Sequence, residues 1–239
     1  MPTLHEVTKR AKEGSLDSVY VFVGAERLLV ERAVEAIRSA VDEMGAPGFN
    51  VEVFDGKGLE ASRAVSAART LPMMADKRFV LVRHADAMTP TEQNALALYL
   101  DDPADSACVV LTADKLDGRG KLAKAAKKSG SLVDAKPLRG RELREFIRSE
   151  ATKREHSIEP KAIETLLDAV GDDLGAIDDA IERLSLFVGP GQRIDTDAVM
   201  RCVTRIRVES IWSLVDAIGL KDKRKGCLLN TSPSPRDHG

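Results

Sequence analysis

Short runs of β-branched and aromatic residues recur through the first half of the sequence. The first is VYVFV at residues 19–23, and further runs lie at 51–54, 79–82, 108–111 and 132–133. Short apolar runs bounded by polar or turn-forming residues are typical of buried β-strands. The pattern therefore predicts a strand at each of these positions.

Helical periodicity occupies the gaps between the predicted strands. Apolar side chains at steps of four and three residues mark the first helix, and they are Val30, Val34, Ile37, Val41 and Met44. Shorter patterns of the same kind lie at 61–68, 96–100 and 121–128. Strands that alternate with helices are joined in parallel by right-handed crossovers. We therefore predict a doubly wound parallel α/β domain over residues 1–137.

Beyond Pro137 the pattern changes to helices alone. Amphipathic segments lie at 143–147, 163–170, 174–184 and 195–203. Gly171 follows the second of these segments and Gly189 follows the third, and glycine commonly ends a helix. We expect a small helical domain over residues 138–205.

The C-terminal residues fall into two parts. Apolar residues with helical spacing at 211–218 predict another helix, and we assign residues 206–225 to the start of a further helical domain. The segment at 226–239 has two Ser-Pro steps and no periodicity, which predicts disorder. It also resembles a translated sequencing adapter, so we expect the natural chain to continue beyond Lys225 with other residues.

Composition and charge narrow the class of protein. The chain has 239 residues, of which 43% are hydrophobic and 31% are charged, as expected of a globular protein. The 36 basic and 38 acidic residues nearly cancel, so no overall field favours nucleic acid or an anionic membrane. The sequence contains no apolar run of about 18 residues, so it predicts no membrane span.

Cysteine and histidine usage indicates a reducing compartment and no metal. The 3 cysteines include no CxxC pair, and the 4 histidines show no HxxH or HExxH spacing. We therefore expect a cytoplasmic protein without a metal site.

The turn after the first predicted strand is the position of a phosphate-binding loop in nucleotide-binding α/β proteins. A working loop reads GxxxxGK[ST], because backbone amides, a lysine and a hydroxyl hold the phosphates and Mg²⁺. Here the turn reads GAERLLVERA, with Gly24 but without the second glycine, the lysine or the hydroxyl. We expect no cofactor, and a divergent nucleotide site at Gly24, Glu26 and Asp86 is the alternative.

Four stretches together resemble one family, the delta subunit of the bacterial DNA polymerase III clamp loader. They are VYVFVGAERLLVERAVEAIR at 19–38, ARTLPMMADKRFVLVRHAD at 68–86, VGDDLGAIDDAIERLSLF at 170–187 and ESIWSLVDAIGLKDKRKG at 209–226. The resemblance implies an AAA+-like α/β domain with a degenerate nucleotide site at 1–137 and a helical lid at 138–205. It also implies that 206–225 begins a collar domain, which family members continue for roughly another hundred residues.

The resemblance assigns a role to the loop that contains Leu71, Pro72, Met73 and Met74. In this family the loop between an early helix and the next strand carries an exposed hydrophobic pair that binds the sliding clamp, and Met73 and Met74 fall at those positions. From the residues alone, packing of both methionines into a local core is the simpler interpretation, and Leu71 fits either role. Pro72 restricts its own φ and favours an extended Leu71.

The family also implies a function and a set of partners. The chain would bind the beta sliding clamp through Leu71, Pro72, Met73 and Met74 and help to open it for loading onto DNA during replication. It would belong to the DNA polymerase III holoenzyme without intrinsic catalysis or ATP hydrolysis of its own. The delta-prime and tau/gamma subunits would bind through the collar, DNA would be contacted only indirectly, and no membrane is implied.

Two alternatives remain at this point. One is a divergent P-loop-like NTPase that uses the first turn. The other is a nucleic-acid-binding module, because the helix predicted at 121–128 carries Lys121, Lys124, Lys127 and Lys128. A solvated helix face explains these lysines more simply, since no aromatic residues are interleaved with them.

Overall fold

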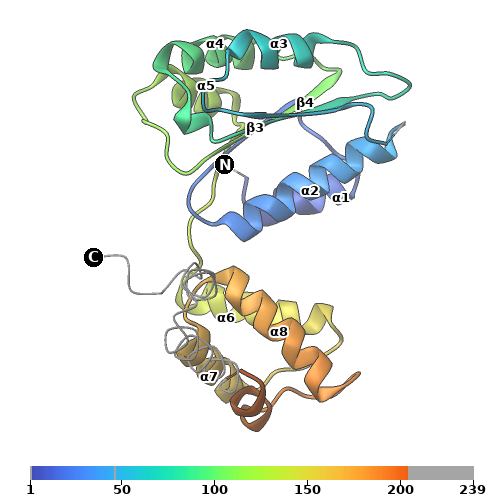
Figure 1. Ribbon diagram of the computed structural model, residues 1–239, viewed down its shortest axis with the longest axis vertical. Coiled ribbons are helices and arrows are strands. Elements are labelled where there is room, and N and C mark those ends of the chain that lie inside the picture. Colours follow the sequence, from blue (N-terminus) through green and yellow to red (C-terminus); the bar gives the residue numbers. More distant parts are fainter. Residues whose placement is uncertain (1, 46, 204–239) are drawn as a thin grey trace, which may run out of the picture. The chain divides into compact units, whose positions relative to one another are not determined.

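The computed structural model describes residues 2–45 and 47–203, which form two compact units that divide between Pro137 and Leu138 (Figure 1). The expected start of the collar at 206–225 and the tail at 226–239 lie outside the described residues.

A parallel five-stranded sheet forms the first unit. The strands are β1 (Val19–Val23), β2 (Val51–Asp55), β3 (Arg78–Arg83), β4 (Ala107–Ala113) and β5 (Leu132–Asp134). Their order is β2-β3-β4-β1-β5, and every neighbouring pair is parallel. The predicted doubly wound α/β fold is confirmed, with each strand at or slightly beyond the bounds of its apolar run.

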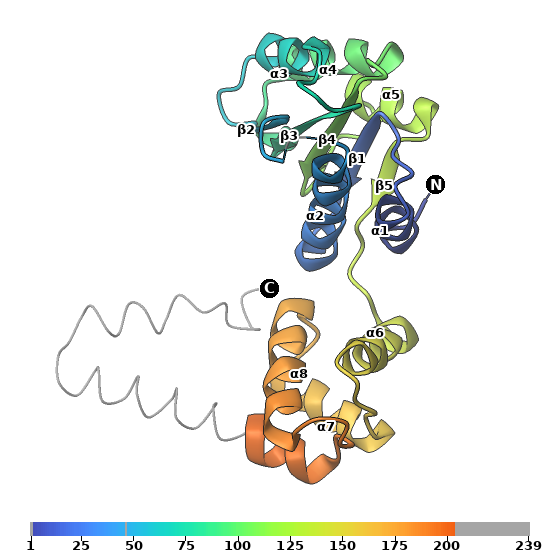
Figure 2. The same ribbon diagram turned by 90° about the vertical axis from the view of Figure 1, so that its right-hand side faces the viewer.

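Helices cover both faces of the sheet (Figure 2). One face carries α3 (Ala61–Arg69), α4 (Pro90–Asp101) and α5 (Lys121–Ser129), and the other carries α1 (Leu4–Lys12) and α2 (Arg27–Glu43). Successive side chains of a strand point to opposite faces. On β1, Val19 and Val21 therefore pack toward α3, α4 and α5, whereas Tyr20 and Phe22 pack toward α1 and α2.

Helix α1 was not predicted from the sequence. Its first turn is a capping box, in which the Glu6 amide donates to the Thr3 hydroxyl and the Thr3 amide donates to the Glu6 carboxylate. The Thr3 amide, and then the Thr3 hydroxyl, which also donates to the Glu6 carboxylate, lower the pKa of Glu6. Leu4, Val7 and Ala11 are buried at helical spacing against α2. The capping residues and this spacing are the signals that would have revealed the helix.

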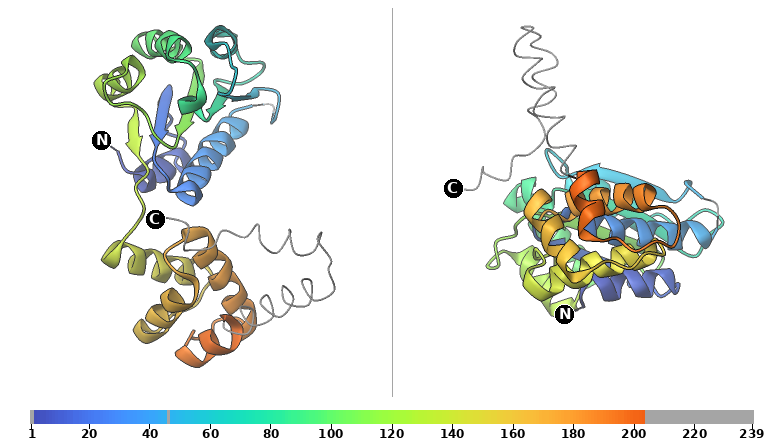
Figure 3. Two further views of the ribbon diagram at one scale, coloured as in Figure 1. Left: turned by 60° about the vertical axis from the view of Figure 1, so that its left-hand side comes forward. Right: turned by 90° about the horizontal axis from the view of Figure 1, so that it is seen from below.

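The second unit contains α6 (Gly140–Lys153), α7 (Pro160–Val170) and α8 (Leu174–Val188), followed by helical residues at 196–203 (Figure 3). Its core includes Ile147, Ile163, Leu166, Ile177 and Ile181. These helices lie where the apolar periodicity predicts them. The assignment of this unit as an AAA+ lid stays a prediction.

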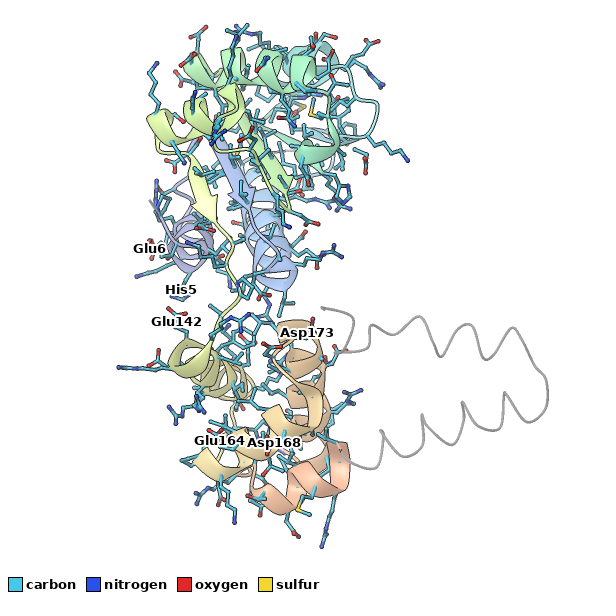
Figure 4. All side chains as sticks on the ribbon, turned by 90° about the vertical axis from the view of Figure 1, so that its left-hand side faces the viewer. His5, Glu6, Glu142, Glu164, Asp168 and Asp173 are labelled. Atoms are coloured by element: carbon cyan, nitrogen blue, oxygen red, sulfur yellow. The ribbon has the colours of Figure 1, made fainter. Side chains whose placement is uncertain are left out.

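Polar contacts connect the segments of this unit. Arg144 on α6 pairs with Glu164 on α7 at 2.6 Å, and Glu164 and Asp168 lie one turn apart on α7 (Figure 4). A parallel bridge between Ile158 and Ile194 joins the loop before α7 to the loop after α8. Apolar periodicity does not predict this bridge, because it joins two loops.

Candidate functional site

The connection between α3 and β3 begins at Thr70, the residue that caps the end of α3. Thr70 is extended, with φ −74° and ψ 129°, although its amide and hydroxyl still donate to the Ser66 carbonyl at 3.0 and 2.8 Å. Pro72 follows two residues later and has no amide hydrogen with which to continue a helix. The chain therefore crosses to the amino end of β3 in a non-helical loop, residues 70–77, which we call the methionine loop.

Three large apolar side chains of the methionine loop are exposed. The exposed fractions are 77% for Leu71, 57% for Met73 and 84% for Met74, and Pro72 is half-buried. The interpretation that both methionines pack into a local core is therefore wrong. A cluster of exposed large apolar side chains on one loop is typical of a protein-binding surface.

The backbone of the methionine loop is nevertheless tightly held. Asn50, which directly precedes β2, is only 2% exposed and bonds the backbone of Met73 through both polar atoms of its amide group. Gly45 lies directly against the backbone of Met74 and Ala75. The loop thus presents exposed side chains on a backbone that is held by its neighbours.

Two basic side chains anchor the junction between the methionine loop and β3. Lys77 Nζ donates to the Asp105 carbonyl at 2.7 Å, and the Arg78 guanidinium pairs with Glu52 Oε1 at 2.6 Å. The first contact connects the loop to the segment that precedes β4, and the second connects the start of β3 to β2. Lys77 and Arg78 are therefore partly engaged within the unit.

The degenerate phosphate-loop position lies at the opposite, carboxyl edge of the sheet. The Gly24 amide donates to the Ala113 carbonyl at 3.0 Å, and the Glu26 amide donates to the Ala135 carbonyl at 3.1 Å. A phosphate loop needs its backbone amides free to donate to phosphate oxygens. Glu26 stands at the amino end of α2 and is only 8% exposed.

A cavity of about 440 Å³ lies beside α2 at this edge, where the strand order reverses between β1 and β4. Its apolar lining residues are Phe22, Val30, Val34, Leu81 and Ala113, and its ionisable ones are Arg27, Glu31, Glu35, Arg83, His84 and Asp114. Such switch points often bind ligands in α/β proteins.

Several charged groups at this edge are engaged with one another. Arg27 pairs with Asp114 at 3.5 Å, and His84 Nδ1 lies 3.0 Å from Asp55 Oδ2. The Lys57 amide and then His84 lower the pKa of Asp55. Asp86, the third residue of the alternative nucleotide site, is exposed on the short helix η1 (Ala85–Ala87) and does not line the cavity.

The lysines of α5 lie on its exposed face, while Leu122, Ala123 and Ala126 are buried. Lys128 pairs with Asp101 on α4 at 3.1 Å. This arrangement is that of an ordinary amphipathic surface helix.

Residues 2–45 and 47–203 contain neither a metal-binding cluster nor a helix suited to span a membrane. In these ranges no three His, Cys, Asp or Glu side chains are grouped so that they could hold a metal ion. No helix in the same ranges combines the length and the apolar character needed to cross a membrane.

The parallel sheet and the helices on both of its faces define the class of protein, which is a doubly wound α/β protein. The RuvB Holliday junction branch migration motor of Thermotoga maritima has a similar fold, with a TM-score of 0.53 and 15% identity. That match covers 92% of this chain and 74% of the RuvB chain.

The family is narrower than this class. The family profile named DNA polymerase III, delta subunit, matches residues 20–136. The DNA clamp loader delta protein YqeN of Bacillus subtilis is 30% identical, with a TM-score of 0.70 over 95% of this chain and 70% of that chain. The chain therefore belongs to the DNA polymerase III delta subunit family, which confirms the resemblance seen in the sequence.

A curated relative shows how much of a family member the chain spans. The DNA polymerase III subunit delta of Bacillus subtilis strain 168 is 31% identical over 223 residues, which are 89% of this chain. The chain spans 64% of the length of that relative.

Sequence reasoning located the methionine loop but missed the residues that brace it. Asn50 and Gly45 lie more than 20 positions from Met73 along the chain, and no motif connects them to it. Phe49, which is 69% exposed, was missed for the same reason. A single sequence carries no signal for such contacts.

Proposed function

We propose that this chain is the clamp-loader subunit that binds the beta sliding clamp and helps to open it for loading onto DNA during replication. The contact residues are Leu71, Pro72, Met73 and Met74. The observation that carries this proposal is the pair of exposed methionines on a loop whose backbone is held by the rest of the unit. Family membership supports the same role.

Methionine is well suited to this contact. Its unbranched, polarisable side chain adapts to the shape of a groove, and burying one contributes about 1.5 to 3 kcal/mol by apolar transfer. Two such side chains on one loop would form the centre of the interface, with Leu71 beside them. The fixed backbone lowers the entropy lost on binding.

Opening of the clamp follows from differential binding. A ring-shaped clamp shifts toward its open form only when the loader binds that form more tightly than the closed form. The methionine loop and nearby surfaces of the α/β unit would supply this difference. The delta-prime and tau/gamma subunits would bind through the collar, and DNA would be reached only within the assembled loader in the cytoplasm.

ATP would act in neighbouring subunits and not in this chain. The amides of Gly24 and Glu26 donate to protein carbonyls, and the turn contains no lysine to reach a phosphate. These features support a subunit without ATP hydrolysis.

Surface plasmon resonance against an immobilised bacterial beta clamp tests the proposal. Changing Met73 and Met74 together to Ser should weaken binding by at least about tenfold. Because both side chains are exposed, the melting temperature should stay within about 2 °C. Leu98→Ser is the matched control, since Leu98 is 73% exposed on α4. This variant should bind the clamp as tightly as the unchanged chain does.

Two results would contradict the proposal. One is an unchanged chain that is folded but does not bind the clamp. The other is a double serine variant that binds as tightly as the Leu98→Ser control.

A further inference from the structure

Asn50 contacts the methionine loop at two places. Its side-chain Oδ1 accepts from the Met73 amide at 2.7 Å, and its Nδ2 donates to the Met73 carbonyl at 2.9 Å. Its own backbone carbonyl accepts from the amide of Phe79, the second residue of β3, at 2.7 Å. One buried residue therefore holds both the middle of the loop and the strand that follows it.

The pair of side-chain bonds requires an amide group. Met73 offers one donor and one acceptor, and a carboxamide presents the complementary acceptor and donor in one plane. Aspartate has nearly the same shape but no donor, so it would place a second acceptor against the Met73 carbonyl. Because Asn50 is only 2% exposed, water would not readily replace the lost bond.

The turn that leads into Asn50 carries another exposed apolar side chain. Phe49 is 69% exposed and directly precedes the residue that bonds Met73. The chain connectivity and the Asn50 bonds therefore place Phe49 beside the methionine loop. Both segments lie at the amino ends of β2 and β3, at the edge of the sheet opposite the degenerate nucleotide position.

We propose that Asn50 is a positioning residue for clamp binding, and that Phe49 joins Met73 and Met74 in one apolar contact surface. This inference rests on the proposed function, since it assumes that the methionine loop binds the clamp. Asn50 is covered and acts through Met73, whose backbone it holds in the form presented to the partner. Phe49 contacts the partner directly.

The variant Asn50→Asp tests the positioning role. It should weaken clamp binding by about tenfold, because the loop must then be ordered during binding. The Met73 amide should exchange its hydrogen with solvent at least about tenfold faster, since its acceptor is no longer held in place. Asn94→Asp on α4 is the matched control, because it makes the same chemical and charge change at a site away from the loop.

A combined variant separates positioning from general destabilisation. If Asn50 acts through the methionines, Asn50→Asp should add less than about twofold when Met73 and Met74 are already Ser. Asn50→Ser, which removes the amide without adding charge, should give the same pattern and serves if the aspartate variant does not fold. An independent, additive loss would overturn the positioning role.

The variant Phe49→Ser tests the wider contact surface. It should weaken clamp binding by at least about fivefold with little change in melting temperature, since the ring is exposed. The Leu98→Ser control should not weaken it. If Phe49→Ser binds the clamp as tightly as this control does, Phe49 is not part of the contact surface.

The inference and the proposed function fail in different ways. If the double serine variant loses affinity while Asn50→Asp binds like the unchanged chain, the inference is wrong and the proposed function stands. If the unchanged chain does not bind the clamp, both the inference and the proposed function are wrong. Faster exchange of the Met73 amide without any loss of clamp affinity would also overturn the positioning role.

Discussion

Gly45 lies so close to the backbone of Met74 that a β-carbon at position 45 would overlap the Met74 carbonyl oxygen. Met74 itself has a φ of 53°, a left-handed conformation that is uncommon for residues other than glycine. The absence of a side chain at position 45 therefore allows the methionine loop to pass close to the end of α2. Met74 turns its side chain outward from this position and is 84% exposed.

Replacing Gly45 with Ala should displace the methionine loop. The new methyl group meets backbone atoms, which cannot move aside as a flexible side chain can, so the free energy of unfolding should fall by about 1 to 3 kcal/mol. Urea unfolding measures the change. Gly118→Ala is the control, because the nearest atom to a β-carbon there is Lys127 Nζ at 3.9 Å. Equal stability of the two variants would contradict the close approach.

Replacing Met74 with Gly should change stability and clamp binding in opposite directions. Glycine adopts a positive φ without strain, so the free energy of unfolding should rise by about 0.5 to 1 kcal/mol. Clamp affinity should fall because the most exposed side chain of the loop is lost. Thermal unfolding and surface plasmon resonance measure the two effects. A loss of stability would show that the Met74 side chain packs within its own domain.

The chain should not bind ATP tightly. With Mg²⁺ present, isothermal titration of ATP should give no binding at micromolar concentrations, because Gly24 and Glu26 already use their amides within the fold. Glu26→Gln should not create a site, since the missing lysine and hydroxyl are not restored. Tight, Mg²⁺-dependent binding would favour the NTPase alternative.

His156 should be important for the stability of the second unit. The ring is 5% exposed, with Nδ1 at 2.8 Å from the Gln192 carbonyl and Nε2 at 2.7 Å from Ser185 Oγ. Because a carbonyl only accepts, Nδ1 must carry the hydrogen. His156→Ala leaves both partners unsatisfied and should lower the free energy of unfolding by about 2 to 4 kcal/mol. The exposed His5→Ala is the control, and urea unfolding followed by circular dichroism compares them.

Cys108 should react with thiol reagents only when the first unit unfolds. It is fully buried on β4, and burial raises its pKa to about 12. At pH 8 the thiol is therefore protonated as well as covered. In a chain with Cys202→Ser and Cys227→Ser, the rate of iodoacetamide labelling should rise with urea in parallel with unfolding. Rapid labelling in the native state would contradict this burial.

The strands and most helices could be predicted because their signal is local. Val19, Tyr20, Val21 and Phe22 form an unbroken apolar run, and because successive side chains point to opposite faces of a sheet, such a run indicates a strand covered on both faces. The missed α1 also carried a local signal in Thr3 and Glu6. The degenerate phosphate loop was likewise visible, because the residues that hold phosphate are defined by their spacing along the chain.

The candidate site could be predicted from the sequence only in part. The amino-acid order placed Leu71, Pro72, Met73 and Met74 between a helix and a strand, but apolar residues in such a loop fit a local core as well as a partner surface. Only the tertiary structure distinguishes these two interpretations, because the exposure of a residue depends on which distant segments cover it. Asn50 and Gly45 contact the loop only once β2 and β3 are paired, since contacts between residues far apart in the chain exist only in the folded state.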